Sequence, residues 1–227
     1  EPFARIKLPY DVTALASATP VRQSYRTAAE NIICGTATGD VYTVELQMVS
    51  QQRGGQCQAM LVGTPQRHFE LSRPVASLVV QERMLASGST MLPGGMKTPV
   101  HLRDLVSQRQ HDANAPPMHG RRYQVAFVPR ASETSPVELI VATNSGSWTV
   151  CAPGTMDPTQ VNALSFGDAT TRLVALAAAP SGEMVAFGDS AGIVHLFKSA
   201  SVMADFPSVH AFVAEPLRPH PPMRPPP

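Results

Sequence analysis

The sequence predicts an all-β fold made of four repeated units, because one hairpin pattern recurs along the chain. Each copy has an apolar run, a polar turn with glycine, and a second apolar run. The runs are rich in β-branched and aromatic residues and are bounded by Thr, Asn, Asp, Ser and Gly, which favours strands and tight turns over helices. The four copies occupy residues 31–46, 84–105, 138–152 and 183–198.

The turn glycines of these hairpins recur at a nearly constant interval. They are Gly39, Gly95, Gly146 and Gly192, and the spacings between them are 56, 51 and 46 residues. A WD repeat has about 40 to 45 residues, and loop insertions accommodate a somewhat longer period. The interval therefore indicates a repeat architecture rather than four unrelated hairpins.

A second repeated element lies upstream of each hairpin and keeps a similar period. Its copies are the apolar segments 12–17, 75–80, 125–128 and 174–179, with starts 63, 50 and 49 residues apart. The alanines of residues 173–179 also permit a helix, but Pro180 and Gly182 would end it early. Two independent signals thus support the same four units.

An inner strand, a loop, a hairpin and a variable outer strand together make a four-stranded propeller blade. The predicted fold is a WD-repeat-like β-propeller, with four blades in residues 1–206. Residues 5–8 could be the outer strand of a preceding blade. An open arc would leave unpaired edges, so we expect further blades on the N-terminal side of a ring of about seven. A small closed ring of four is the alternative.

The remaining segments are predicted to be connections. Residues 207–227 are proline-rich and should form an extended linker, with a PxxP-type ligand as the alternative. Residues 51–65 and 111–119 are expected to be loops.

Composition excludes few functions but limits the setting. The formal charge is +1, so the chain has no net field that would attract nucleic acid or an acidic membrane. No run approaches the roughly 18 to 20 apolar residues of a membrane span, and no membrane partner is expected. Cys34, Cys57 and Cys151 have no paired spacing and are expected to be free thiols in a reducing, cytoplasmic setting.

The segments between residues 101 and 197 resemble a known family when taken in order: HLRDL, YQVAFVP, ELIVATNSG, CAPGTMDP and PSGEMVAFGDSAGIVHLF. The series is similar to the last blades of the propeller in the large, catalytic subunit of the poly(A)-nuclease deadenylation complex. The earlier CGTATGDVYTVEL also resembles a blade of that family. The most specific matches are residues 186–190 and 194–196, while Phe197 stands where the family often has Trp.

This resemblance implies a non-catalytic propeller scaffold that acts in cytoplasmic mRNA decay and P-bodies. The scaffold would dock the nuclease complex on poly(A) ribonucleoprotein. The implied partners are the pseudokinase regulatory subunit of the complex and the poly(A)-binding protein on poly(A) RNA. The family's poly(A)-specific 3'-5' exoribonuclease domain does not lie within these 227 residues, and the alternative is an unrelated WD-repeat interaction scaffold.

Residues 188–192, Gly-Asp-Ser-Ala-Gly, are similar to the segment around the nucleophile of trypsin-like proteases. The sister copies at residues 35–39 and 143–146 favour a hairpin turn, and no separate His and Asp segments complete a triad. A serine hydrolase using Ser190 is therefore the least favoured alternative. The expected blade-hairpin signature is Gly39, Gly95, Gly146, Gly188, Asp189, Ser190, Gly192 and His195.

No catalytic, cofactor or metal residues are predicted. His195 is expected in a strand, within an inter-strand hydrogen-bond network, because the histidines and cysteines lack zinc spacing. Gly94 to Thr98 lacks the adjacent Gly-Lys of a phosphate loop. Tyr123, Trp148, Arg121 and Arg122 could form an RNA patch, but core aromatics beside one basic loop are the favoured interpretation.

Overall fold

The computed structural model is all-β, and its described residues form four antiparallel sheets with no helix among them. The architecture is compatible with the predicted propeller-like fold. The structure describes residues 7–18, 29–50, 57–61, 65–70, 73–91, 100–112, 118–128, 138–151, 161–164, 166, 168–179, 184–198 and 212–213.

The first sheet contains β1 (Val12–Ala18), β2 (Ala29–Thr36) and β3 (Asp40–Ser50), paired in chain order. Two further strands, β4 (Cys57–Leu61) and β5 (Gln66–Glu70), both pair with β3, which is long enough to take β5 near its start and β4 near its end. The predicted loop at residues 51–65 therefore contains a strand. Its residues have no turn chemistry between Cys57 and Leu61, and the unused edge of β3 accepts them.

The other three sheets are simple meanders in which each strand pairs with the next one in the chain. The second sheet is β6 (Val75–Gln81), β7 (Met84–Ser89), β8 (Val100–Asp104) and β9 (Gln110–Asp112). The third is β10 (Tyr123–Val128), β11 (Glu138–Thr143), β12 (Ser147–Cys151) and β13 (Asn162–Ala163). The fourth is β14 (Leu173–Ala178), β15 (Met184–Asp189), β16 (Val194–Lys198) and β17 (Phe212–Val213).

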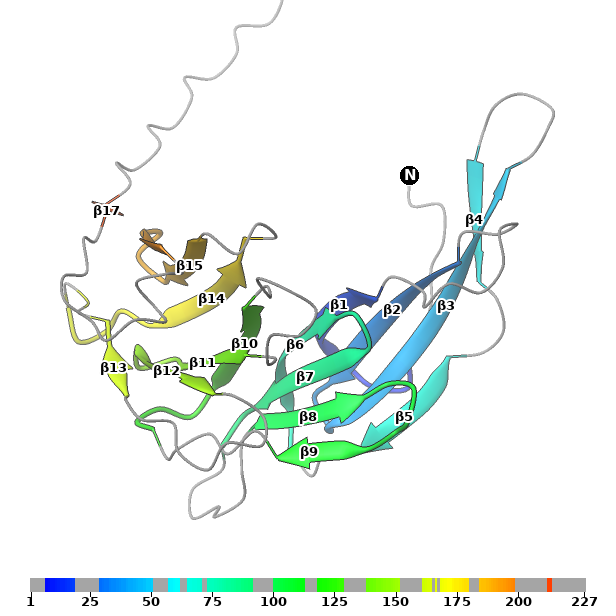
Figure 1. The fold of residues 1–227 in the computed structure, drawn as a ribbon, viewed down its shortest axis with the longest axis horizontal. Coiled ribbons are helices and arrows are strands. Elements are labelled where there is room, and N and C mark those ends of the chain that lie inside the picture. The colour runs from blue at the N-terminus through cyan, green and yellow to red at the C-terminus, as the bar shows by residue number, and fades with distance from the viewer. Residues whose placement is uncertain are drawn as a thin grey trace, which may run out of the picture.

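The sheets fan around their first strands, as Figure 1 shows. Contacts join β1 to β6, β6 to β10 and β10 to β14, so consecutive sheets are neighbours in space. Later strands of each sheet lie progressively further out (Figure 1). This placement confirms that the apolar segment before each hairpin is the inner strand of its sheet.

The strand registers are equivalent from sheet to sheet. The second strand of each sheet ends at a residue that pairs with the start of the first strand: Thr36 with Val12, Ser89 with Val75, Thr143 with Tyr123, and Asp189 with Leu173. Side chains alternate between the two faces of a strand. We call the face that packs on the next sheet in the chain the forward face, and the other the rear face.

Apolar side chains from one forward face and one rear face fill each of the three contacts between sheets. Between the first and second sheets lie Ile33, Val41, Val75, Leu78 and Leu85. Between the second and third lie Ala86, Val100, Leu102, Tyr123, Val125, Phe127, Leu139 and Val141. Between the third and fourth lie Ile140, Ala142, Trp148, Leu173, Val185, Phe187 and Phe197.

The structure tests two further segment predictions. Residues 173–178 form strand β14, so the helical alternative is wrong. Lys7 and Leu8 are not in a strand, and Leu8 packs against Cys34, Tyr42 and Val44 on the rear face of the first sheet. Residues 5 and 6 lie outside the described residues, as does most of the predicted linker, in which Phe212 and Val213 pair with β16.

Candidate functional site

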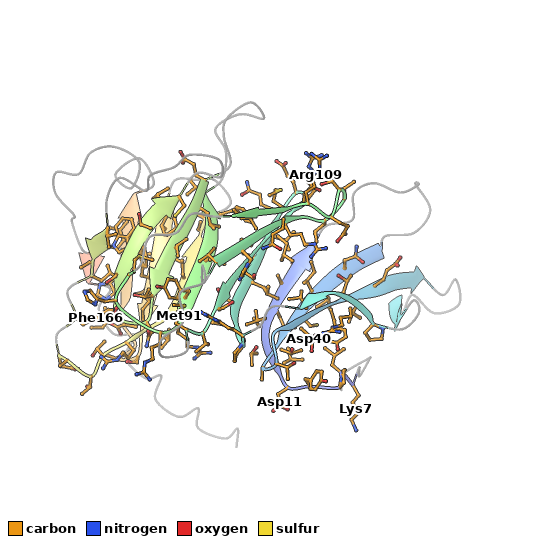
Figure 2. The ribbon with its side chains drawn as sticks, turned by 90° about the horizontal axis from the view of Figure 1, so that it is seen from below. Lys7, Asp11, Asp40, Met91, Arg109 and Phe166 are labelled. Carbon is orange, nitrogen blue, oxygen red and sulfur yellow. The ribbon has the colours of Figure 1, made fainter. Side chains whose placement is uncertain are left out.

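One edge of the row of sheets carries a hydrogen-bond pattern that repeats in every sheet. There the residue after the second strand donates its N–H to the carbonyl of the residue before the first strand. The pairs are Ala37 to Asp11 at 2.9 Å, Thr90 to Pro74 at 2.9 Å, Asn144 to Arg122 at 2.9 Å and Ser190 to Arg172 at 2.8 Å. We call this edge the turn face; Asp11, Asp40, Met91 and Phe166 lie along it in Figure 2, and Arg109 lies at the opposite edge.

Glycine closes the three turns on this face whose residues the structure describes throughout. The φ angles of Gly39, Gly146 and Gly192 are 98°, 89° and 84°, in the region that side chains rarely occupy. Their N–H groups donate back to the last residue of the preceding strand, at 3.1, 2.9 and 3.2 Å. These three signature glycines therefore act through backbone conformation, while Gly95 lies outside the described residues.

Asp189 and His195 form the polar centre of the turn between β15 and β16. Oδ2 of Asp189 lies 3.0 Å from Nε2 of His195, and Oδ1 accepts the N–H groups of Ala191 and Ile193 at 2.9 Å each. Burial acts to raise the pKa of Asp189, but the hydrogen bonds from His195, Ile193 and Ala191 outweigh it and lower the pKa. The carboxylate thus holds the turn and the neighbouring strand together.

Ser190 lies next to this pair but makes a different contact. Its Oγ accepts the N–H of Arg172 at 2.9 Å, and its own N–H donates to the carbonyl of Arg172. Within the described residues, no hydrogen bond joins Ser190 to His195. A Ser-His-Asp triad needs the imidazole between the serine and the carboxylate, whereas here the serine and the imidazole each brace the turn separately.

The residues of the possible RNA patch separate in the structure. Tyr123 and Trp148 are only 2% exposed each and lie in the contacts between sheets. Arg121 and Arg122 are exposed on the turn face, where their N–H groups both donate to Oδ1 of Asn144, at 2.9 and 3.1 Å. The prediction of core aromatics beside one basic loop is confirmed, and no base-stacking surface forms from these aromatics.

Sequence reasoning missed that one or both of the two residues before the first strand are arginine in three sheets. Pro74, Arg122 and Arg172 directly precede the first strands β6, β10 and β14, while Arg73 and Arg121 come one residue earlier. The signal was present in the sequence as Arg-Pro-Val, Arg-Arg-Tyr and Arg-Leu. It becomes visible only when the strand starts are aligned by register, which shows that all four arginines lie on the turn face.

Cys34 and Cys151 are free and buried, as predicted for free thiols. Burial raises the pKa of the Cys151 thiol to about 11 and also raises that of Cys34. The side chains of Cys57 and His111 lie outside the described residues, and His119 is exposed on the turn face. Within the described part of the chain, no three His, Cys, Asp or Glu residues are grouped to hold a metal ion.

No protein-family model matches the sequence, and no curated protein matches it. In the described ranges, the structure contains no long apolar helix of the kind that crosses a membrane.

Proposed function

We propose that this chain is a non-catalytic docking scaffold whose turn face binds other macromolecules. The observation that carries the proposal is that the side chains with catalytic potential make structural hydrogen bonds within the turns. Asp189, His195 and Ser190 each hold the backbone or the neighbouring strand. Rigid sheets that present exposed loop residues suit recognition rather than chemistry.

We further infer that the four sheets are blades of a larger WD-repeat-like propeller. The forward face of the fourth sheet supports this inference, because its register makes it equivalent to faces that are covered in the other sheets. Val174, Met184 and Val194 are 56%, 40% and 40% exposed there. A further sheet packed on this face would bury them, and a ring of about seven blades is a common closed form.

Gly188 on this open face gives the most specific support. Its equivalents are Gly35, Gly88 and Ala142. The two glycines lie where the next sheet comes very close: an added Cβ would clash with Cγ1 of Val75 and with the carbonyl oxygen of Tyr123, respectively. At Gly188 an added Cβ would meet only Ala175 of the same sheet, at 3.3 Å. Gly188 thus occupies a position suited to close packing, but no further sheet of the described structure packs against it.

The finer proposal is that this scaffold belongs to a poly(A)-tail deadenylase subunit. Its support is the ordered resemblance of residues 101–197 to the propeller of the poly(A)-nuclease large subunit. The scaffold would then dock the nuclease on poly(A) ribonucleoprotein in the cytoplasm, with the poly(A)-binding protein and the pseudokinase subunit as partners. An unrelated propeller scaffold shares the architecture but would bind neither.

The test measures binding of the purified chain to immobilised poly(A) coated with the poly(A)-binding protein, by biolayer interferometry. Bare poly(A), the binding protein alone and the pseudokinase subunit are measured in parallel. Saturable binding to the coated RNA or to the pseudokinase subunit is expected. If the folded chain binds none of these, the deadenylase assignment is wrong, although a scaffold for other partners would still fit.

A separate experiment addresses catalysis by Ser190. The folded chain is incubated with a fluorophosphonate probe beside trypsin as a positive control, and the Ser190→Ala variant serves as the matched negative. No labelling of the chain is expected, because Ser190 Oγ is not hydrogen-bonded to His195. Labelling that disappears in the variant would overturn the non-catalytic proposal.

A further inference from the structure

The turn face carries a run of arginines that is confined to three consecutive sheets. The two positions before the first strand are Arg73 and Pro74 in the second sheet, Arg121 and Arg122 in the third, and Thr171 and Arg172 in the fourth. The same positions in the first sheet are Tyr10 and Asp11. We call Arg73, Arg121, Arg122 and Arg172 the arginine arc.

Hydrogen bonds and side-chain contacts join the segments that bear these arginines into one continuous strip. Nη1 of Arg73 lies 2.7 Å from Sδ of Met91, and the N–H of Met91 donates to the carbonyl of Arg121. On the other side, the carbonyl of Asn144 accepts the N–H of Leu173, the residue after Arg172, at 3.1 Å. The arc therefore crosses two contacts between sheets without a break.

The backbone of the arc is fixed while its charges remain available. Asn144 holds the backbone of Arg121 and Arg122, and both side chains are exposed. Arg172 is also exposed, with Nη1 on the carbonyls of Ala169 and Thr171 at 2.6 and 2.8 Å, which neutralises no charge. The arc is thus a preorganised set of cations rather than a network of ion pairs.

Carboxylates near the arc do not cancel it. Asp189 is paired with His195, and Asp40 with Arg67 in the first sheet. Asp168, beside the fourth sheet, accepts three hydrogen bonds from Thr170 and Thr171, and they lower its pKa to about 2. Among the described residues, Asp168 and Asp189 thus place two negative charges beside the four arginines, because the His195 partner of Asp189 is charged only when protonated. The strip still keeps a net positive charge.

The chemistry of the arc selects an acidic partner with planar anionic groups. The guanidinium group presents a fork that matches a carboxylate with two parallel hydrogen bonds. Single-stranded nucleic acid would in addition need aromatic platforms on which bases stack. Tyr123 and Trp148 are buried. Phe166, on the turn face, is partly buried and packs against the apolar cluster between the third and fourth sheets, and this favours a peptide over RNA.

We propose that the arginine arc binds an acidic segment of a partner protein, in an extended conformation across the second, third and fourth sheets. This inference rests on the proposed docking function and names its partner chemistry. Packed sheets lie about 10 Å apart, so three of them span roughly 20 Å, which an extended peptide covers with about six residues.

The test is fluorescence anisotropy with a labelled peptide of alternating glutamate and glycine, roughly ten residues long, and a matched peptide with glutamine in place of glutamate. The full chain should bind the glutamate peptide and not the glutamine peptide. The double variant Arg121→Glu, Arg122→Glu should bind at least about tenfold more weakly, because two charge-assisted contacts are lost. Its urea midpoint, measured in parallel, shows whether it is folded.

Arg109→Glu is the matched control. Arg109 is exposed in the turn between β8 and β9, at the edge opposite the arc (Figure 2). Its substitution changes the net charge by the same amount as each substitution in the arc, but it should alter the affinity for the peptide by less than about twofold. An equal loss in the control would overturn the site, because binding would then follow net charge alone. The same holds if Arg121→Lys, Arg122→Lys, which keeps the charge but not the fork, binds no more weakly than the unaltered chain.

A labelled adenosine oligonucleotide separates the remaining outcomes. If the oligonucleotide binds through the arc and the glutamate peptide does not, the arc is a nucleic-acid site and the peptide proposal is wrong; if neither binds, there is no site. Peptide binding without any binding to coated poly(A) or to the pseudokinase subunit would uphold the arc and refute only the deadenylase assignment.

Discussion

The two faces of strand β15 differ sharply, although they belong to the same six residues. Val185 and Phe187, on the rear face, are buried against the third sheet, where Phe187 lies 5.5 Å from Trp148 between ring centroids. Met184, Ala186 and Gly188, on the forward face, meet no further sheet in the described structure, and Met184 is 40% exposed. The sequence of β15 is therefore suited to a packed sheet on each of its two faces, and the described structure contains one of these two sheets.

The aromatic rear face should dominate the stability of the fourth sheet. Phe187→Ala removes a ring that packs against both Trp148 and Phe197 and should lower the free energy of unfolding by about 3 to 5 kcal/mol. Trp148 is the only tryptophan, so its fluorescence during urea unfolding reports this contact directly. A loss below about 1 kcal/mol would mean that the two sheets do not pack as described.

A pair of glycine variants compares a covered forward face with the open one. Gly88→Ala would force a methyl group against the backbone of Tyr123 and should cost about 1 to 3 kcal/mol, as overpacking does. Gly188→Ala meets only Ala175, and the lower backbone entropy of alanine offsets that contact, so the change should stay below about 1 kcal/mol. Equilibrium urea unfolding of both variants measures the difference.

Equal losses in the two variants would contradict the equivalence of the two positions. The same urea unfolding measurement on Gly188→Ala in a longer form of the protein would test for a further blade. If a further blade packs on the open face, the substitution there should become as costly as Gly88→Ala.

The sequence was sufficient for the features that depend on local pattern. The Asn-Ser-Gly sequence predicts a tight turn with a positive φ at Gly146, because glycine tolerates that conformation, and the observed φ is 89°. The strand at residues 57–61 did not follow, because its pairing depends on the length of β3 rather than on its own residues. The arginine arc also depends on register between distant strands, which apolar periodicity does not reveal.

Acid should act mainly on the carboxylates that brace turns at both edges of the sheets. Hydrogen bonds from the N–H of Ser107 and Val106, with the charge of Arg83, lower the pKa of Asp104 despite its burial. A carboxyl group whose pKa is lower in the folded chain stabilises it above the unfolded pKa of about 3.9 and loses this effect as the pH falls toward the folded pKa. Urea midpoints should therefore fall on acidification below about pH 4.

Asp104→Asn should show a smaller fall over the same pH range, because the amide does not titrate. Asp11→Asn is the control, since the Asp11 side chain is exposed and the hydrogen bond of this residue in the turn face is accepted by its backbone carbonyl. Its acid response should match that of the unaltered chain. If both variants respond to acid alike, the Asp104 carboxylate does not stabilise its turn.

The smallest effect is expected on the open face itself. Met184→Gln replaces an apolar side chain that is already 40% exposed and has no sheet in front of it, so the free energy of unfolding should change by less than about 0.5 kcal/mol. Val185→Ala, one residue along the same strand, is the matched comparison and should cost at least about 1 kcal/mol because Val185 is buried against the third sheet. A cost for Met184→Gln as large as that for Val185→Ala would show that the forward face is covered in solution. The same measurement at increasing protein concentration would then identify a second copy as the cover, since only association between chains makes stability depend on concentration.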